Sequence, residues 1–145
     1  MSIAKQFNHD FSKGAFELFD QNGNRVYHED PVGYWAKQEY DQKGNQVYYE
    51  DSIGYWAKRE YDQDGNQVYR EDSSGYWVKQ EFDQNNNLIY FESSDGYWSK
   101  QEYDQNGNQV YNEDSMDGVI IDNRPKPCED KVIEIDGVKY KLSPL

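Results

Sequence analysis

The chain has little cysteine, little basic charge and no long hydrophobic run. Cys128 is the only cysteine among 145 residues, which excludes an internal disulfide framework and fits a reducing compartment. No apolar stretch is long enough to cross a membrane. Residues 1–11 also lack the apolar segment that a signal peptide needs. We therefore expect a cytoplasmic protein without membrane contact.

Basic residues are scarce, since 15 Lys and Arg stand against 28 Asp and Glu, giving a formal net charge of −13. Binding to nucleic-acid phosphates or anionic lipids requires stripes of Lys and Arg, so we expect neither as a direct partner. A protein partner with a basic surface is electrostatically favoured. The alternative is that the charge only keeps an aromatic-rich sheet soluble.

Aromatic residues are abundant, at 17% of the chain, and they recur at fixed positions. Gly-Tyr-Trp returns at 33–35, 54–56, 75–77 and 96–98, and an aspartate opens a loop at 20, 41, 62, 83 and 104, always 21 residues apart. Disordered chains lack such aromatics, whereas repeat proteins bury an apolar face of each unit on its neighbours. Because a catalytic site is a single asymmetric constellation, this repetition argues against an enzyme and against a cofactor.

Each unit contains two short stretches rich in Tyr, Trp and Val, each followed by a turn that usually reads Asp-x-x-Gly. This pattern predicts hairpins with type I turns and a G1 bulge, in which Gly, or Asn86 in the fourth copy, takes a positive φ. The predicted fold class is all-β. We expect an antiparallel β-meander of repeated hairpins, with about ten or more short strands in an elongated, twisted and curled sheet, followed by a C-terminal β-hairpin.

Three regions follow from this reading. Residues 1–19 form a degenerate N-terminal cap, residues 20–118 form the hairpin repeats, and residues 119–145 contain the last strand, a linker and the C-terminal hairpin. Asp136-Gly137 predicts a two-residue turn that places Glu134 opposite Lys139. We expect this hairpin to cover the open edge of the sheet, which would otherwise invite edge pairing between copies.

Side chains alternate between the two faces of a sheet, so a repeat of 21 residues would reverse the faces of each successive unit unless one residue is left out of the alternation. We call this the parity condition. We predict two unlike turns, a three-residue loop after Asp41 and a four-residue loop in which Glu50 pairs with Tyr55. One face should then carry Tyr34, Ala36, Gln38, Tyr40, Gln46, Tyr48 and Glu50. The opposite face should carry Trp35, Lys37, Glu39, Val47 and Tyr49.

The string Glu-Tyr-Asp-x-x-Gly-Asn at 39–45, 60–66 and 102–108, and its variant at 81–87, resembles the YD (Rhs-type) repeat over about residues 12–118. The resemblance implies a spiralling β-shell in long members of the family, often around a toxin. About five units without a toxin domain do not imply that role here. With its Val-Ile-Glu-Ile-Asp-Gly-x-Lys-Tyr tail at 132–140, the chain also resembles small phage or prophage accessory proteins. Gly-Tyr-Trp resembles aromatic cell-wall-binding and choline-binding repeats.

Sites with metal or catalytic chemistry are not indicated. The loop at 20–24 has Gly in its fourth position rather than the sixth position of an EF-hand, and the second copy has Lys43 at its third position. His9 and His28 have no companion ligands that would indicate zinc. Glu39 and its equivalents recur in every copy, unlike a glycosidase pair, and we expect them to pair with Lys37 and its equivalents.

The remaining prediction is a non-enzymatic binding protein. Its candidate partner-binding residues form a ladder that varies between copies, the tryptophan ladder and a glutamate ladder: His28, Tyr49, Arg70, Phe91 and Asn112; Trp35, Trp56, Trp77 and Trp98; Glu39, Glu60, Glu81 and Glu102. We expect the varying ladder to be exposed. The leading hypothesis is a phage-type inhibitor that occupies the basic site of a nucleic-acid-binding host-defence protein. A carbohydrate- or cell-wall-binding module and a structural spacer or assembly protein remain alternatives.

Overall fold

The computed structural model describes residues 2–124 and 132–141; Cys128 and most of the predicted linker at 123–127 lie outside these ranges. Two short helices, α1 (Ile3–Gln6) and the 3₁₀ helix η1 (Phe11–Lys13), precede the strands. The strands are β1 (Phe16–Phe19), β2 (Arg25–Glu29), β3 (Trp35–Tyr40), β4 (Gln46–Asp51), β5 (Trp56–Tyr61), β6 (Gln67–Asp72), β7 (Trp77–Phe82), β8 (Leu88–Ser93), β9 (Trp98–Tyr103), β10 (Gln109–Asp114), β11 (Gly118–Asp122), β12 (Val132–Ile135) and β13 (Val138–Lys141).

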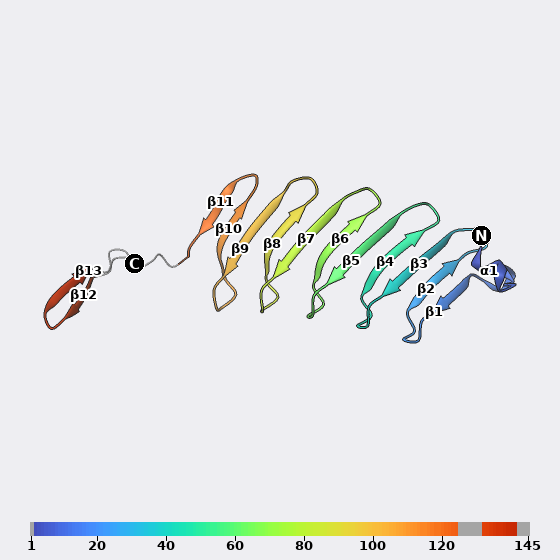
Figure 1. Ribbon diagram of the computed structural model, residues 1–145, viewed down its shortest axis with the longest axis horizontal. Coiled ribbons are helices and arrows are strands. Elements are labelled where there is room, and N and C mark those ends of the chain that lie inside the picture. The colour runs from blue at the N-terminus through green and yellow to red at the C-terminus, as the bar shows by residue number, and fades with distance from the viewer. Residues whose placement is uncertain (1, 125–131, 142–145) are drawn as a thin grey trace.

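Strands β1 to β11 form one antiparallel sheet in chain order, so the predicted all-β meander is confirmed. The sheet is a single elongated layer that stays open, and the expected curling of the sheet was wrong (Figure 1). Side chains of the sheet itself bury the small residues that a second layer would bury in other sheets. Ala57 is 0% exposed and Ala36 is 4% exposed although no other layer packs on them. Small residues are buried beneath larger neighbours on the same face, which removes the need to curl.

The turns at the two ends of the hairpins have the same backbone pattern, so the prediction of two unlike turns was wrong. After β3, the Asp41 amide donates to the Asn45 carbonyl at 2.9 Å and the Gly44 amide donates to the Asp41 carbonyl at 3.1 Å. After β4, the Asp51 amide donates to Tyr55 at 3.0 Å and the Gly54 amide donates to Asp51 at 3.1 Å. Gly44 has a φ of 87°, and Asn86 in the fourth copy has a φ of 64°, as the predicted turn chemistry requires.

A β-bulge inside one strand of each repeat resolves the parity condition. Glu39 pairs with Tyr48 and Tyr40 pairs with Gln46, so Val47 is an extra residue without a partner on β3. The same shift leaves Val68, Ile89 and Val110 unpaired in the later copies. A bulge opposes two residues to one and thereby restores the alternation of side chains. An odd repeat therefore keeps every unit in the same orientation with identical turns.

The bulge changes the predicted composition of the two faces. Gln38 lies opposite Tyr49, so the varying ladder shares the face of Ala36 and Gln38 rather than that of Trp35. We call this the tyrosine face: Tyr34, Ala36, Gln38, Tyr49, Asp51 and their equivalents. Lys37 lies opposite Glu50, and Glu50 lies opposite Trp56. We call this the tryptophan face: Trp35, Lys37, Glu39, Tyr48, Glu50 and their equivalents. The predicted sides of Tyr48, Tyr49 and Glu50 were wrong because the prediction placed the extra residue in a loop.

The C-terminal hairpin forms a sheet of its own. Strands β12 and β13 pair with Glu134 opposite Lys139, as predicted, and with Ile133 opposite Tyr140; Asp136 and Gly137 in the turn both have positive φ. Among the described residues this hairpin is not hydrogen-bonded to β11. The expected cover of that edge is therefore not made by strand pairing. Strand β11 is therefore the end of the large sheet.

Candidate binding face

Each tryptophan of the tryptophan face is partly covered by the lysine two residues further along its strand. The Lys58 ammonium lies 5.3 Å from the Trp56 ring centroid, and the equivalent distances at Trp35, Trp77 and Trp98 are 5.7, 5.1 and 5.3 Å. Side chains two apart on a strand point to the same face, which brings each pair together. The cation–π contact holds the ammonium over the indole, so the expected ion pair between Lys37 and Glu39 does not form.

The glutamates of the predicted ladder are exposed at the same face. Glu39, Glu60, Glu81 and Glu102 are all exposed, at positions that recur every second strand. Neighbouring strands lie about 4.8 Å apart, so the carboxylates follow one another at about 10 Å. Within residues 2–124 and 132–141, Glu39, Glu60 and Glu81 have neither a hydrogen bond nor an ion pair, whereas Glu102 accepts from Arg124 at 3.2 Å.

A second row of carboxylates lies beside tyrosine hydroxyls. Tyr69 donates to Glu71 at 3.4 Å, and Tyr111 donates to Glu113 at 2.8 Å. Burial and the neighbouring Glu71 charge raise the pKa of Tyr69, because both disfavour a phenolate. These hydroxyls therefore remain protonated donors at neutral pH.

Three equivalent hollows follow the tryptophan face, one at each bulge of the central repeats. The middle hollow is lined by Glu60, Val68, Tyr69, Lys79 and Glu81, together with Gln80. Its neighbours have the same residues except for Ile89 in place of valine and the basic Arg59 in place of glutamine: Glu39, Val47, Tyr48, Lys58, Arg59 and Glu60 on one side, and Glu81, Ile89, Tyr90, Lys100, Gln101 and Glu102 on the other. Each hollow therefore joins an apolar floor to two carboxylates, and adjacent hollows share one of them.

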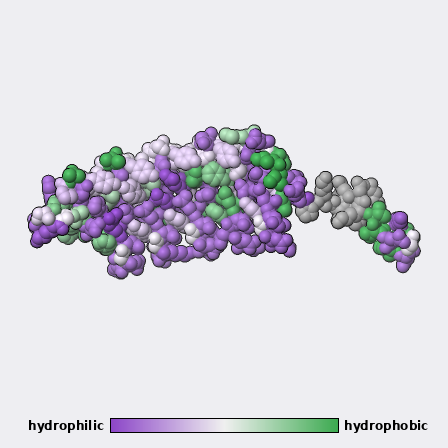
Figure 2. Space-filling model, turned by 180° about the vertical axis from the view of Figure 1, so that it is seen from behind, coloured by the Kyte–Doolittle hydropathy of each residue, from purple (hydrophilic) through white to green (hydrophobic). Residues whose placement is uncertain are grey.

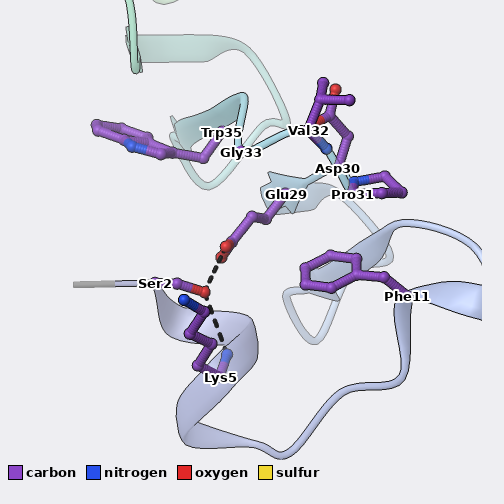
Figure 3. Close-up of a pocket in the computed structure, with 9 residues that line it drawn as sticks. All are labelled: Ser2, Lys5, Phe11, Glu29, Asp30, Pro31, Val32, Gly33 and Trp35. Carbon is purple, nitrogen blue, oxygen red and sulfur yellow. Dashed lines mark hydrogen bonds between the residues drawn. The ribbon is translucent and has the colours of Figure 1, made fainter.

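At the N-terminal end, the chain's own first residues cover the tryptophan face. Ser2 donates its hydroxyl to Glu29 (Figure 3), and the Ala4 amide donates to the same carboxylate at 3.1 Å. Glu29 is the equivalent of Glu50, and it is only 4% exposed. Burial alone would raise its pKa, but the hydrogen bonds from Ser2, Ala4 and Tyr27 hold the pKa below its ordinary value. Ala4 packs with Phe16 and Tyr27 in a small core.

At the C-terminal end, Arg124 covers the tryptophan face. Its guanidinium carbon lies 3.8 Å from the ring centroid of Tyr111, the equivalent of Tyr69. The guanidinium also contacts Glu102 at 3.2 Å and Asp122 at 2.9 Å. Tyr111 is buried, with 9% of its surface exposed, whereas Tyr48, Tyr69 and Tyr90 are half-buried. Both ends of the face are thus occupied, and the central repeats are open.

The varying ladder lies on the opposite face and is half-buried, so the expectation of an exposed ladder beside the tryptophans was wrong. Its members contact the tyrosine of Gly-Tyr-Trp in different ways. The Tyr49 hydroxyl is 2.8 Å from that of Tyr34, Arg70 donates to Tyr55 at 3.3 Å, and the Phe91 ring is 5.9 Å from that of Tyr97. The bond to Tyr34, together with burial, raises the pKa of Tyr49. The structure therefore brings together the predicted tryptophans and glutamates, and places His28 to Asn112 elsewhere.

The loop aspartates serve the turns. Asp62 accepts from the amides of Asp64 and Asn66, both at 2.9 Å, and from the Asn66 side chain at 3.0 Å. The hydrogen bond from the Asn66 side chain is the main reason that the pKa of Asp62 is lowered. Among the described residues, no group of three or more His, Cys, Asp or Glu side chains could hold a metal ion. No described helix is both long and apolar enough to cross a membrane.

Comparisons with known proteins show the fold alone. No protein-family model matches the chain, and no curated protein matches it. The chain is similar to the solved structure of TcdB2-TccC3-TEV, with a TM-score of 0.54 and 18% identity over 70% of this chain. It is also similar to the Tc holotoxin pore of Photorhabdus luminescens carrying TccC3-D651A, with a TM-score of 0.52 and 16% identity over 73% of this chain. The match covers 5% and 6% of those chains. This chain therefore has a β-repeat fold like part of a toxin complex.

The sequence did not indicate the hollows, and Glu50 and its equivalents Glu71, Glu92 and Glu113 were expected on the opposite face. The hollows exist because the bulge brings an apolar residue to the tryptophan face beside Tyr48. The repeated run Gln-Val-Tyr is compatible with a bulge, because Val and Tyr are consecutive apolar residues, but it does not distinguish a bulge from a longer loop.

Proposed function

We propose that this chain is a non-enzymatic binding protein that docks its tryptophan face on a protein partner with a basic surface. The observation that carries the proposal is the row of Glu39, Glu60 and Glu81, exposed and without a partner in the described part of the chain. Exposed carboxylates of one sign along a stiff sheet attract a basic surface and speed its association. The tyrosine face lacks such a row, because its main carboxylates belong to the turns.

The finer form of the proposal is an inhibitor that occupies the basic site of a nucleic-acid-binding protein, such as a host-defence nuclease in an infected cell. The support is the net charge of −13 together with the regular spacing of the carboxylates. A site that binds nucleic acid presents Lys and Arg to phosphates, and an acidic ladder offers the same charge in a rigid frame. The cytoplasm is the compartment that this form of the proposal requires.

A carbohydrate-binding role has less support from the geometry. A sugar ring must stack on an open aromatic face, but each indole of the ladder lies beneath a lysine ammonium at 5.1–5.7 Å. The lysines would have to leave the rings before a sugar could bind. A spacer role makes no use of the unpaired glutamates.

The test is capture of partners by the immobilised chain, followed by competition with duplex DNA and RNA. We expect that nucleic acid displaces the captured protein and that raising the salt from 50 to 500 mM releases it, because screening weakens exposed charge pairs. Glu60→Lys should lower the affinity about tenfold, since one attraction becomes a repulsion. Asp64→Lys is the matched control, because Asp64 is exposed in a turn where the second copy already has Lys43.

Two results would contradict the proposal. One is binding that survives 500 mM salt, which would show that exposed charges do not carry it. The other is an equal effect of Glu60→Lys and Asp64→Lys, which would show that total charge matters and the tryptophan face does not. Loss of binding to a glycan array in Trp56→Ala would instead favour the carbohydrate module.

A further inference from the structure

The chain itself fills one copy of a site that it repeats four times. The hollows at Tyr48, Tyr69 and Tyr90 are open, and the fourth position at Tyr111 has Arg124 stacked on its ring at 3.8 Å. The Arg124 guanidinium is held between two carboxylates, Glu102 at 3.2 Å and Asp122 at 2.9 Å. From this equivalence we infer that the three open hollows are subsites for arginine side chains of a protein partner. The inference rests on the proposed function and names the chemistry of the partner.

The open hollows provide two of the three groups that Arg124 contacts, namely the tyrosine ring and the carboxylate equivalent to Glu102. The middle hollow places Glu60 and Glu81 on either side of Val68 and Tyr69. The planar guanidinium can stack on an aromatic ring and donate to carboxylates at its edges, which the compact ammonium of lysine does less well. Val68 provides an apolar surface for the methylene stem.

Two lining residues differ between the open and the filled copies. Lys79 lies opposite Tyr69, where Asp122 lies opposite Tyr111, and Glu81, two residues beyond Lys79, has the position of Arg124. The Lys79 ammonium is directed to Trp77, 5.1 Å from its ring centroid, and Glu81 is the second carboxylate of the hollow. The open hollows at Tyr69 and Tyr90 therefore each have two lining carboxylates, shared in part with a neighbouring hollow, against one lysine. The hollow at Tyr48 also has Arg59 and favours a cation least.

The spacing of the hollows selects the conformation of the partner. Equivalent positions lie two strands apart, which is about 10 Å. A polyproline II segment rises about 9.3 Å in three residues and returns every third side chain to the same side. A β-strand of three residues has a similar length but turns every third side chain to the opposite side. The partner that fits is an extended segment of polyproline II type with arginine at every third residue.

The experiment measures binding of fluorescent peptides to the full chain by anisotropy in low salt. The probe is Arg-Pro-Pro-Arg-Pro-Pro-Arg. One control replaces the arginines with lysines, and another has the same composition with the three arginines adjacent. We expect the probe to bind about tenfold more tightly than either control, because only the probe stacks a guanidinium in each hollow.

Variants of the middle hollow locate the binding. Tyr69→Leu should weaken binding of the probe about tenfold, whereas Tyr69→Phe, which keeps the ring, should retain it. Asp64→Asn is the off-site control, and far-UV circular dichroism with a melting curve shows that each variant is folded. Arg124→Ala should open the fourth hollow, so that a peptide with four arginines at the same spacing gains about tenfold over the three-arginine probe.

Specific outcomes would overturn the inference. Equal binding of the arginine and lysine peptides, equal binding of the clustered peptide, or an unchanged affinity in folded Tyr69→Leu would each do so. If both basic peptides bind equally and Glu60→Lys weakens both, the arginine subsites fail while the acidic docking face stands. If no peptide binds, the arginine subsites also fail, and the partner capture with its Asp64→Lys control decides the docking face separately.

Discussion

At the scale of single residues, the turns require glycine because of its positive φ and not because a side chain would clash with neighbouring atoms. Gly65 has a φ of +92°, and a Cβ added there would meet nothing within 4 Å. The fourth copy places Asn86 at the equivalent position with a φ of 64°. Asparagine is the residue that best tolerates this region after glycine, so the chain contains its own comparison of the two.

We expect Gly65→Ala to lower the free energy of unfolding by about 1–2 kcal/mol, the cost of the left-handed conformation for a residue with a Cβ. Gly65→Asn should cost less than half of that amount, since Asn86 already fits the same turn. Urea unfolding followed by tryptophan fluorescence measures both. Equal losses in the two variants would show that the turn is limited by packing, contrary to the open space around Gly65.

At the scale of strands, the bulge sets which residues share a face. Val68 is the extra residue between the pairs Glu60–Tyr69 and Tyr61–Gln67. Removing it would keep both turns and leave Gln67 opposite Tyr61 and Tyr69 opposite Glu60, so the strands would pair without a bulge and keep their faces. Removing a whole 21-residue unit would remove the bulge together with its two strands and leave the alternation intact.

We therefore expect deletion of Val68, like deletion of residues 52–72, to leave a folded sheet. The single deletion would remove the apolar floor of the middle hollow, while Glu71 keeps its place opposite Trp77 on the tryptophan face. The larger deletion should give a shorter sheet with an unchanged circular dichroism spectrum per residue and a cooperative melt. The prediction is wrong if the Val68 deletion loses its cooperative melt, since the strand pairing would then depend on the bulge.

Turns and pairing order could be predicted from the sequence because they depend on local chemistry. Asp41 and Gly44 specify their turn within five residues, and Asp136-Gly137 does so within two. The position of the bulge could not be derived in this way, since an extra residue satisfies parity equally well in a loop or in a strand. The stacking of Arg124 on the Tyr111 ring could not be predicted either, because it depends on the path of the chain after β11 and no sequence pattern links the two residues.

At the scale of the whole molecule, a meander that stays open has two edge strands. Strand β11 is the more apolar of the two ends that the structure describes, with Val119 56% exposed and Ile120 50% exposed. Figure 2 shows a hydrophobic patch at the end of the hydrophilic sheet that lies next to the C-terminal segment. An unpaired edge with apolar side chains is a template for another strand, and the hairpin of β12 and β13 is not hydrogen-bonded to it.

We expect two copies to pair through β11 in an antiparallel dimer, because a two-fold edge contact closes, whereas joining β11 to β1 would generate open fibres. Sedimentation at increasing concentration should show a monomer–dimer equilibrium. Ile120→Lys should raise the dissociation constant at least about tenfold, since a charged residue at an edge opposes pairing. Ile53→Lys is the matched control, because Ile53 is 80% exposed in a turn away from either edge. A monomer at every concentration, or an equal effect of Ile53→Lys, would show that β11 is not an assembly edge.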